Sequence, residues 1–127
     1  MIYIISIAIP VALLLTLRFG YRLPWWRPNE DQRCVDLWTF THFCHGLGFY
    51  TALKTGLLLS GASALPYNLV IVTMLLEFCW ELWENSQLGI RQQHSWGYPR
   101  YRGDSVLNSL FDLFACILGA LSLAWFW

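Results

Sequence analysis

The chain has 127 residues, of which 57% are hydrophobic, 17% aromatic and 13% charged, and its formal net charge is zero. Soluble domains average about 25% charged residues, so this composition favours a protein that contacts a lipid bilayer. Zero net charge, without a basic stripe or zinc-finger spacing, argues against nucleic-acid binding. The length fits a single domain, and we expect residues 1–127 to form one membrane domain.

Four apolar stretches predict an all-α, polytopic membrane protein with four transmembrane helices in a small bundle. A bilayer core of about 30 Å requires about 20 helical residues. The expected helices cover about residues 2–20, 37–59, 65–85 and 104–127. The first stretch contains Pro10, which membrane helices tolerate, and no small-residue cleavage site follows it. We therefore interpret it as a retained helix rather than a signal peptide.

The positions of the basic residues predict the orientation of these helices. Seven of the eight lie between the first and second helices or between the third and fourth, namely Arg18, Arg22, Arg27, Arg33, Arg91, Arg100 and Arg102. The positive-inside rule places these two loops in the cytoplasm and both termini outside. Lys54 is the exception, and we expect it to extend towards the outer headgroups.

Polar and ionisable side chains interrupt the last three apolar stretches at helical spacing. They are His42 and His45 in the second stretch, Glu77, Glu81 and Glu84 in the third, and Asp104, Asn108 and Asp112 in the fourth. Within each stretch they fall inside about 80° of the helix circumference. A charge at the centre of a membrane helix costs about 2.5 to 3.5 kcal/mol. We therefore predict that the three polar stripes face one another rather than lipid.

The stripes are also expected at one depth. With a rise of about 1.5 Å per residue, most of these side chains lie about 6 to 14 Å from the cytoplasmic ends of their helices. Several carboxylates cannot all be ionised side by side in a medium of low dielectric constant, so some must be protonated, paired with histidine or neutralised by metal. The spacing thus predicts one shared site in the cytoplasmic third.

Imidazole and carboxylate ligands suit a divalent metal such as Zn, Mn, Fe or Mg. The candidate ligands are His42, His45, Glu77, Glu81 and Asp112. The candidate catalytic or supporting residues, one of which could serve as general base, are Glu84, Asp104 and Asn108.

The structural alternative is a hydrogen-bonded polar core that fixes helix packing. In that case Glu84 and Asp104 are solvated at the interface, or Asp104 caps the last helix. The segment 86–103 is expected to be a turn-rich loop in which His94 is solvated. Trp38, Trp80 and Trp83 are expected to be interface anchors.

Three motifs carry a resemblance to a known family. They read THFCHG at 41–46, EFCWELWENS at 77–86 and GDSVLNSLFD at 103–112. In this order they resemble a bacterial inner-membrane family of unknown function with the pattern HxxHG, ExxxExxENS and GDSxxNSxxD, over about residues 36–120. The resemblance implies a multi-pass fold in the inner (plasma) membrane and supplies no activity. The DxxDG motif of CDP-alcohol phosphotransferases and the many histidine boxes of membrane hydroxylases are absent.

Three functions remain open at this point. The leading hypothesis is a metal-dependent membrane hydrolase or transferase that acts on a lipid-linked or amphiphilic substrate, for instance at a phosphate ester. The second is a proton or cation pathway, which would require an oligomer because one four-helix protomer is thin. The third is an accessory subunit of a membrane complex, in which the polar stripes face outward.

Overall fold

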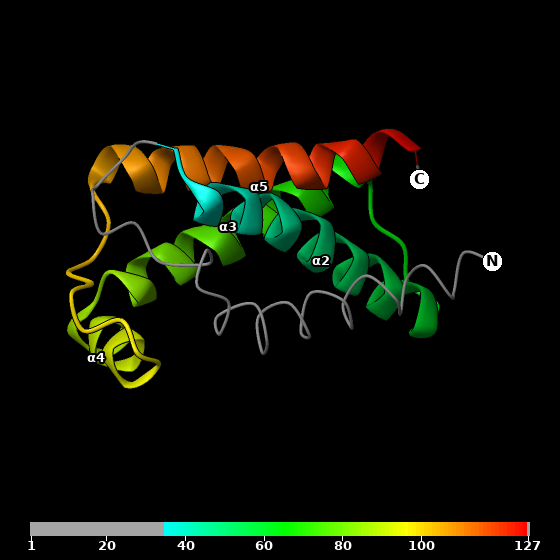
Figure 1. Ribbon diagram of the computed structural model, residues 1–127. Coiled ribbons are helices and arrows are strands. Elements are labelled where there is room, and N and C mark those ends of the chain that lie inside the picture. The colour runs from blue at the N-terminus through cyan, green and yellow to red at the C-terminus, as the bar shows by residue number, and fades with distance from the viewer. Residues whose placement is uncertain (1–34, 127) are drawn as a thin grey trace.

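Residues 35–126 are described by a computed structural model, and within this range the chain is all-α. It contains four helices and no strand in these residues: α2 (Leu37–Leu59), α3 (Pro66–Glu84), α4 (Gln87–Ser95) and α5 (Val106–Phe126). The three long helices pack together, with α2 and α5 running in one direction and α3 in the other (Figure 1). The helix expected at 2–20 lies outside the described residues.

The boundaries of the long helices lie close to the predicted ones, and local capping explains them. α2 covers the predicted range, because the carboxylate of Asp36 accepts hydrogen bonds from the backbone N–H groups of Trp38 (2.8 Å) and Thr39 (3.2 Å). α5 begins at Val106, two residues later than predicted. The hydroxyl of Ser105 accepts from the backbone N–H of Asn108 at 3.1 Å, so the prediction that Asp104 caps this helix is wrong.

The prediction of a loop over 86–103 is also wrong in part, because α4 occupies its first half. The hydroxyl of Ser86 caps α4 by accepting from the backbone N–H of Gly89 at 3.2 Å. The helix is nine residues long, polar, and ends before Gly97, which has a φ of 101°. An isolated helix of this length is marginal in water. Its stability therefore depends on packing against the end of α3.

Two glycines allow α2 and α5 to approach closely. A Cβ atom at Gly46 would lie 1.9 Å from the carbonyl oxygen of Cys116, and one at Gly119 would lie 2.2 Å from the carbonyl oxygen of Phe43. Small residues at such crossings are typical of helix pairs in membranes, where van der Waals contact drives association. This crossing fixes which faces of α2 and α5 are available to α3.

The distribution of polarity is the reverse of that in a water-soluble bundle. Within residues 35–126, eleven polar or charged residues are buried, whereas buried hydrophobic residues number eight. Large apolar side chains are exposed instead along the outer faces of α3 and α5, including Ile71, Leu75, Phe78, Leu82, Leu110, Phe114, Leu118 and Leu121. Such a surface is expected where the surrounding solvent is lipid.

One of the described helices, α5, is long and apolar enough to cross a membrane by length and composition alone. The polar residues of α2 and α3 make those two helices less apolar on average, and these residues point inward. A bundle with four spans therefore stays a prediction, whereas the all-α fold is confirmed for residues 35–126.

Candidate metal centre

The two histidines of α2 are three positions apart in the sequence and so lie on one face of the helix. Both are 3% exposed. Their imidazole rings make an edge-to-face contact with centroids 4.9 Å apart. The capped start of α2 and the close α2–α5 crossing hold this face against α3, so two nitrogen donors are presented at one point of the interior.

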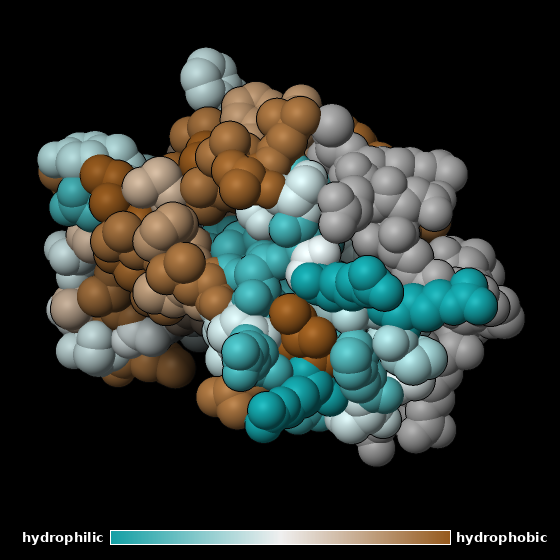
Figure 2. Space-filling view, turned by 90° about the vertical axis from the view of Figure 1, so that its left-hand side faces the viewer, coloured by the Kyte–Doolittle hydropathy of each residue, from teal (hydrophilic) through white to brown (hydrophobic). Residues whose placement is uncertain are grey.

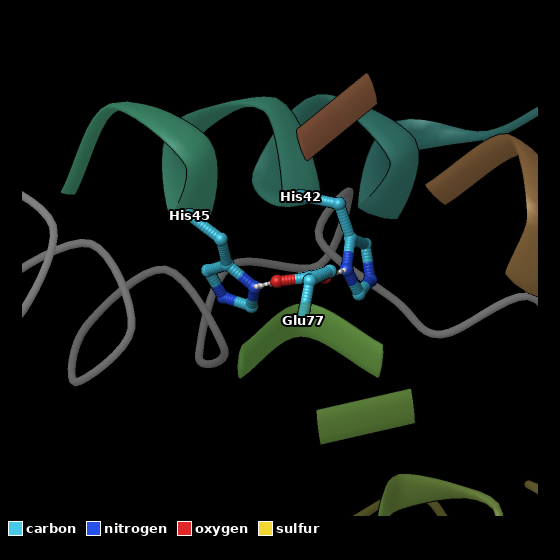
Figure 3. Close-up of side chains that lie close together, drawn as sticks. All are labelled: His42, His45 and Glu77. Carbon is cyan, nitrogen blue, oxygen red and sulfur yellow. Dashed lines mark hydrogen bonds and ion pairs between the residues drawn. The ribbon is translucent and has the colours of Figure 1, made fainter. Parts of the chain in front are cut away.

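Glu77 of α3 lies between the two histidines (Figure 3). Its carboxylate contacts Nδ1 of His42 through Oε1, and its Oε2 lies 3.1 Å from Nδ1 of His45. Glu77 is fully buried, with 0% exposure. A buried carboxylate requires compensation by hydrogen bonds or by a cation. Both imidazoles supply that compensation here, and a metal ion held by the same three side chains would supply it as well.

Two more carboxylates complete the surroundings of His42. Oε1 of Glu81 lies 3.4 Å from Nδ1 of His42, and Oδ2 of Asp112 on α5 lies 3.8 Å from Nε2. All five predicted metal ligands are therefore buried in one cluster to which three helices contribute. Two triads, His42–His45–Glu77 and His42–Glu81–Glu84, have ligand atoms within 4.8 Å of one another.

The structure places Glu84 in the interior, not at a solvated interface. It is 5% exposed and accepts hydrogen bonds from Nε1 of Trp80 at 2.8 Å and from Nε2 of Gln93 at 2.7 Å. Trp80 also packs edge-to-face on His45, with ring centroids 5.4 Å apart. The expectation that Trp80 only anchors the interface is therefore wrong. Trp38 is likewise buried, whereas Trp83 is exposed.

Asp104 lies at the rim of this cluster rather than among the metal ligands. Its Oδ2 accepts a hydrogen bond from the hydroxyl of Tyr101 at 2.5 Å. Burial raises the pKa of the Asp104 carboxyl above its usual range, and the Tyr101 hydroxyl opposes part of that shift. Burial also raises the pKa of the Tyr101 phenol, and the nearby carboxylates of Glu84 and Asp104 raise it further. Asp104 and Tyr101 thus form a hydrogen-bonded pair beside the centre.

Asn85 joins the end of α3 to the start of α5, a role that the sequence did not indicate. Its Nδ2 donates to the backbone carbonyl of Glu81 at 3.0 Å, to Oε2 of Glu81 at 3.3 Å and to the hydroxyl of Ser109 at 3.3 Å. Its Oδ1 accepts from the backbone N–H of Asp104. The predicted site residue Asn108 is buried one turn further along α5, 1% exposed.

Three residues that complete the site were missed as site residues in the sequence. Trp80 could have been found because it stands four positions before Glu84, a spacing at which helical side chains meet. Asn85 follows Glu84 directly and ends α3, where polar side chains bind free backbone groups. Gln93 offered no such signal, because its contact with Glu84 depends on how α4 folds back. His94, expected in a solvated loop, is exposed on α4 and binds the carbonyl of Tyr101 through Nε2 at 2.8 Å.

The polar stripes of the three long helices converge, as their spacing predicts. Outward-facing stripes, which the hypothesis of an accessory subunit requires, are not found among the described residues. The arrangement presents two imidazoles and several carboxylates in a buried cluster, which is the ligand chemistry of a divalent metal such as Zn, Mn or Fe.

Comparison with known families confirms the expectation of a bacterial family of unknown function. Residues 6–126 match the family described as "Protein of unknown function (DUF2585)". The chain belongs to this family. The match extends over most of the chain, including every residue of the cluster. It assigns no activity, and the roles of the individual side chains stay predictions.

Curated relatives come from several bacteria and carry the name UPF0314 protein. One from Paracoccus denitrificans is 39% identical over 92 residues, covering 72% of this chain and 46% of the relative. One from Novosphingobium aromaticivorans is 36% identical over 90 residues, covering 67% and 44%. One from Sinorhizobium fredii is 36% identical over 94 residues, covering 73% and 46%.

The matched region thus spans slightly less than half the length of these relatives. No solved structure matches the chain.

Proposed function

We propose that this protein is a metal-dependent enzyme of the bacterial inner membrane that acts on a lipid-linked or amphiphilic substrate by hydrolysis or group transfer. The observation that carries the proposal is the buried carboxylate of Glu77 between His42 and His45, inside a bundle whose outer surface is apolar. Intramembrane ionisable residues are costly and usually serve a function. Two imidazoles and a carboxylate whose ligand atoms already lie within 4.8 Å of one another could bind a metal ion with little rearrangement.

The membrane orientation in this proposal follows the polar end of the bundle. Figure 2 views the molecule from the end at which α4 lies in Figure 1 and shows hydrophilic side chains gathered there beside apolar patches. Arg91, Arg100 and Arg102 are all exposed. The positive-inside rule then favours α4 at the cytoplasmic face, with α2, α3 and α5 in the bilayer and both termini outside. The metal centre would lie in the cytoplasmic third.

The proposed roles follow the distances. His42, His45 and Glu77 hold the metal, with Glu81 and Asp112 completing its coordination. Glu84 is a candidate general base within the second triad, while Asp104 and Asn108 lie outside both triads and are candidates to support the ligands. A metal held there would supply Lewis-acid activation of a bound water or of a substrate oxygen.

Metal analysis of the purified protein tests the central part of this proposal. The wild-type protein, extracted in mild detergent at neutral pH, is expected to retain a stoichiometric divalent metal by inductively coupled plasma mass spectrometry. His45→Ala is expected to lose it. His94→Ala is the matched control, because His94 is exposed on α4 and outside both triads. Absence of metal from the wild type, or equal metal in His45→Ala, would overturn the metal assignment.

Membrane integration has its own test. We expect the protein to remain in the pellet after alkaline carbonate extraction of bacterial membranes, because the exposed faces of α3 and α5 are apolar. The cysteine of an Arg100→Cys variant, at an exposed position, should react with a membrane-impermeant thiol reagent only after the cells are permeabilised so that the reagent reaches the cytoplasmic side. Reaction in intact cells would reverse the proposed orientation.

A proton or cation pathway is the second candidate, and three buried hydroxyls favour it. Tyr50, Thr51 and Thr73 are 0% exposed, and their hydroxyl oxygens have no hydrogen-bond partner among the described residues. Thr73 lies one helical turn from Glu77, away from α4. These groups could continue a relay from the cluster towards the other end. Proton flux in liposomes that Glu81→Gln abolishes would support this candidate, and unchanged flux would remove it.

A further inference from the structure

A second feature lies beside the metal centre, on the outer side of the contact between α3 and α5. It is a partly open cavity of about 370 Å³. Binding sites for small molecules start at about this size. Its polar residues come from the end of α3 and from the segment that enters α5, and they are Glu81, Asn85, Asp104 and Ser109.

The remainder of the lining is apolar: Leu82 and Val106 flank the polar residues, and Phe78, Leu110 and Leu113 continue along both helices towards the middle of the bundle. Phe78 on α3 and Leu113 on α5 lie at this end, each about one helical turn beyond Glu81 or Ser109. Phe78 is half exposed, so the cavity opens laterally through the apolar surface. A polar head and an apolar chain are therefore accommodated at opposite ends of one groove.

Glu81 connects this groove to the metal centre. Its carboxylate lines the cavity, and its Oε1 lies 3.4 Å from Nδ1 of His42. Glu81 is 6% exposed; its Oε1 faces His42, and its Oε2 accepts a hydrogen bond from Nδ2 of Asn85, another lining residue, at 3.3 Å. A carboxylate oxygen that accepts one long hydrogen bond at the end of a cavity can accept a second donor from a ligand.

The charge of the lining selects the head group. It contains the carboxylates of Glu81 and Asp104 and no Lys, Arg or His among the described residues. Asn85 already uses its N–H groups on Glu81 and Ser109. An ammonium head would meet acceptors, whereas a phosphate or carboxylate head would meet two like charges.

We propose that this groove binds a single-chain amphiphile with a primary ammonium head, with its head at Glu81 and Asp104 and its chain between α3 and α5. The inference rests on the proposed function for its membrane location and makes the groove the lateral route by which substrate reaches the metal centre. It narrows the substrate class from amphiphiles in general to amino-amphiphiles and disfavours an anionic phosphate ester.

Photoaffinity labelling tests the groove directly. The full-length protein in nanodiscs of neutral lipid is exposed to dodecylamine carrying a mid-chain diazirine, and to dodecyl phosphate with the same diazirine. Mass spectrometry then maps the labelled peptides. We expect the amine to label the 78–82 and 110–113 segments about fivefold more than the phosphate does, as an ion pair at a partly exposed site allows. Equal labelling by the two probes, or stronger labelling by the phosphate, overturns the head-group assignment.

Two variants and a control locate the site. Leu113→Trp fills the apolar end and should abolish labelling of these segments, whereas Leu118→Trp, on α5 outside the lining, should not. Asp104→Asn keeps an acceptor for Tyr101 but should remove most of the preference for the amine. Labelling that Leu113→Trp leaves unchanged overturns the groove itself.

The labelling experiment and the metal analysis test different claims, so either one can fail while the other succeeds. His45 does not line the groove, so His45→Ala should lose metal while retaining selective labelling by the amine. Selective labelling in a protein without metal would remove the metal centre and leave the amphiphile site in place. Bound metal without selective labelling would retain the metal centre and remove the amphiphile site.

Discussion

Gly46 of α2 lies directly against the backbone of Cys116 on α5, so closely that a Cβ atom at Gly46 would be 1.9 Å from that carbonyl oxygen. Gly119 makes the reciprocal approach to the carbonyl of Phe43 on α2. This crossing sets the separation of the two helices that carry His42 and Asp112. The geometry of the cluster therefore depends on two glycines, Gly46 and Gly119, that are not part of it.

Gly46→Ala should destabilise the bundle, because the backbone of Cys116 cannot move aside as a flexible side chain can. Overpacking of this kind costs about 1 to 3 kcal/mol. Gly56→Ala is the matched control on the same helix, since a Cβ there meets nothing within 4 Å, and it should be neutral or stabilising by about 0.5 to 1 kcal/mol. Thermal unfolding in detergent measures both. Equal melting temperatures for the two variants would contradict the close crossing.

Gln93→Ala should loosen α4 from the rest of the bundle. Gln93 is 0% exposed, and its amide donates to Oε1 of Glu84 at 2.7 Å. Loss of a donor to a buried carboxylate costs about 1 to 3 kcal/mol. Hydrogen exchange should rise across α4 while the centre of α2 stays protected. Gln92→Ala removes only an exposed bond to Ser95 and should leave exchange unchanged, so equal effects of the two variants would exclude the proposed role of Gln93.

Asn85→Asp should weaken the junction between α3 and α5, although the two side chains have nearly the same shape. Aspartate can still accept from the backbone N–H of Asp104, but it cannot donate to Glu81 or Ser109. It also adds a like charge beside Glu81. We expect a loss of about 1 to 3 kcal/mol in unfolding free energy. Asn68→Asp, at an exposed position of α3, should change little, and a similar loss there would indicate a nonspecific charge effect.

Asp104→Asn should change how stability depends on pH. Burial raises the pKa of Asp104 in the folded protein above its ordinary value of 3.8. A carboxyl whose pKa is higher in the folded state destabilises the fold as pH rises above the unfolded-state value. The variant should therefore match the wild type well below pH 3.8 and become relatively more stable as pH rises from there towards neutrality. Parallel stability profiles for the two proteins would show that Asp104 does not titrate differently on folding.

The three long helices, and the faces on which their polar side chains lie, follow from the sequence alone, whereas α4 does not. Asp36 and the apolar run that follows determine where α2 starts, because capping and helix propensity act over a few residues. The spacing of His42 and His45, and that of Glu77 and Glu81, determines one polar stripe per helix. The cost of exposing such stripes to lipid then requires them to converge.

The pairing of these side chains depends on the tertiary structure. Glu77 lies between the two histidines, whereas Glu84, on the same stripe, turns to Trp80 and Gln93. No periodicity distinguishes these two glutamates. Their partners depend on the crossing of α2 and α5 and on the return of α4 against α3, and both involve residues distant in the chain. Packing between helices, rather than local propensity, therefore separates a candidate metal ligand from a carboxylate that holds α4 in place.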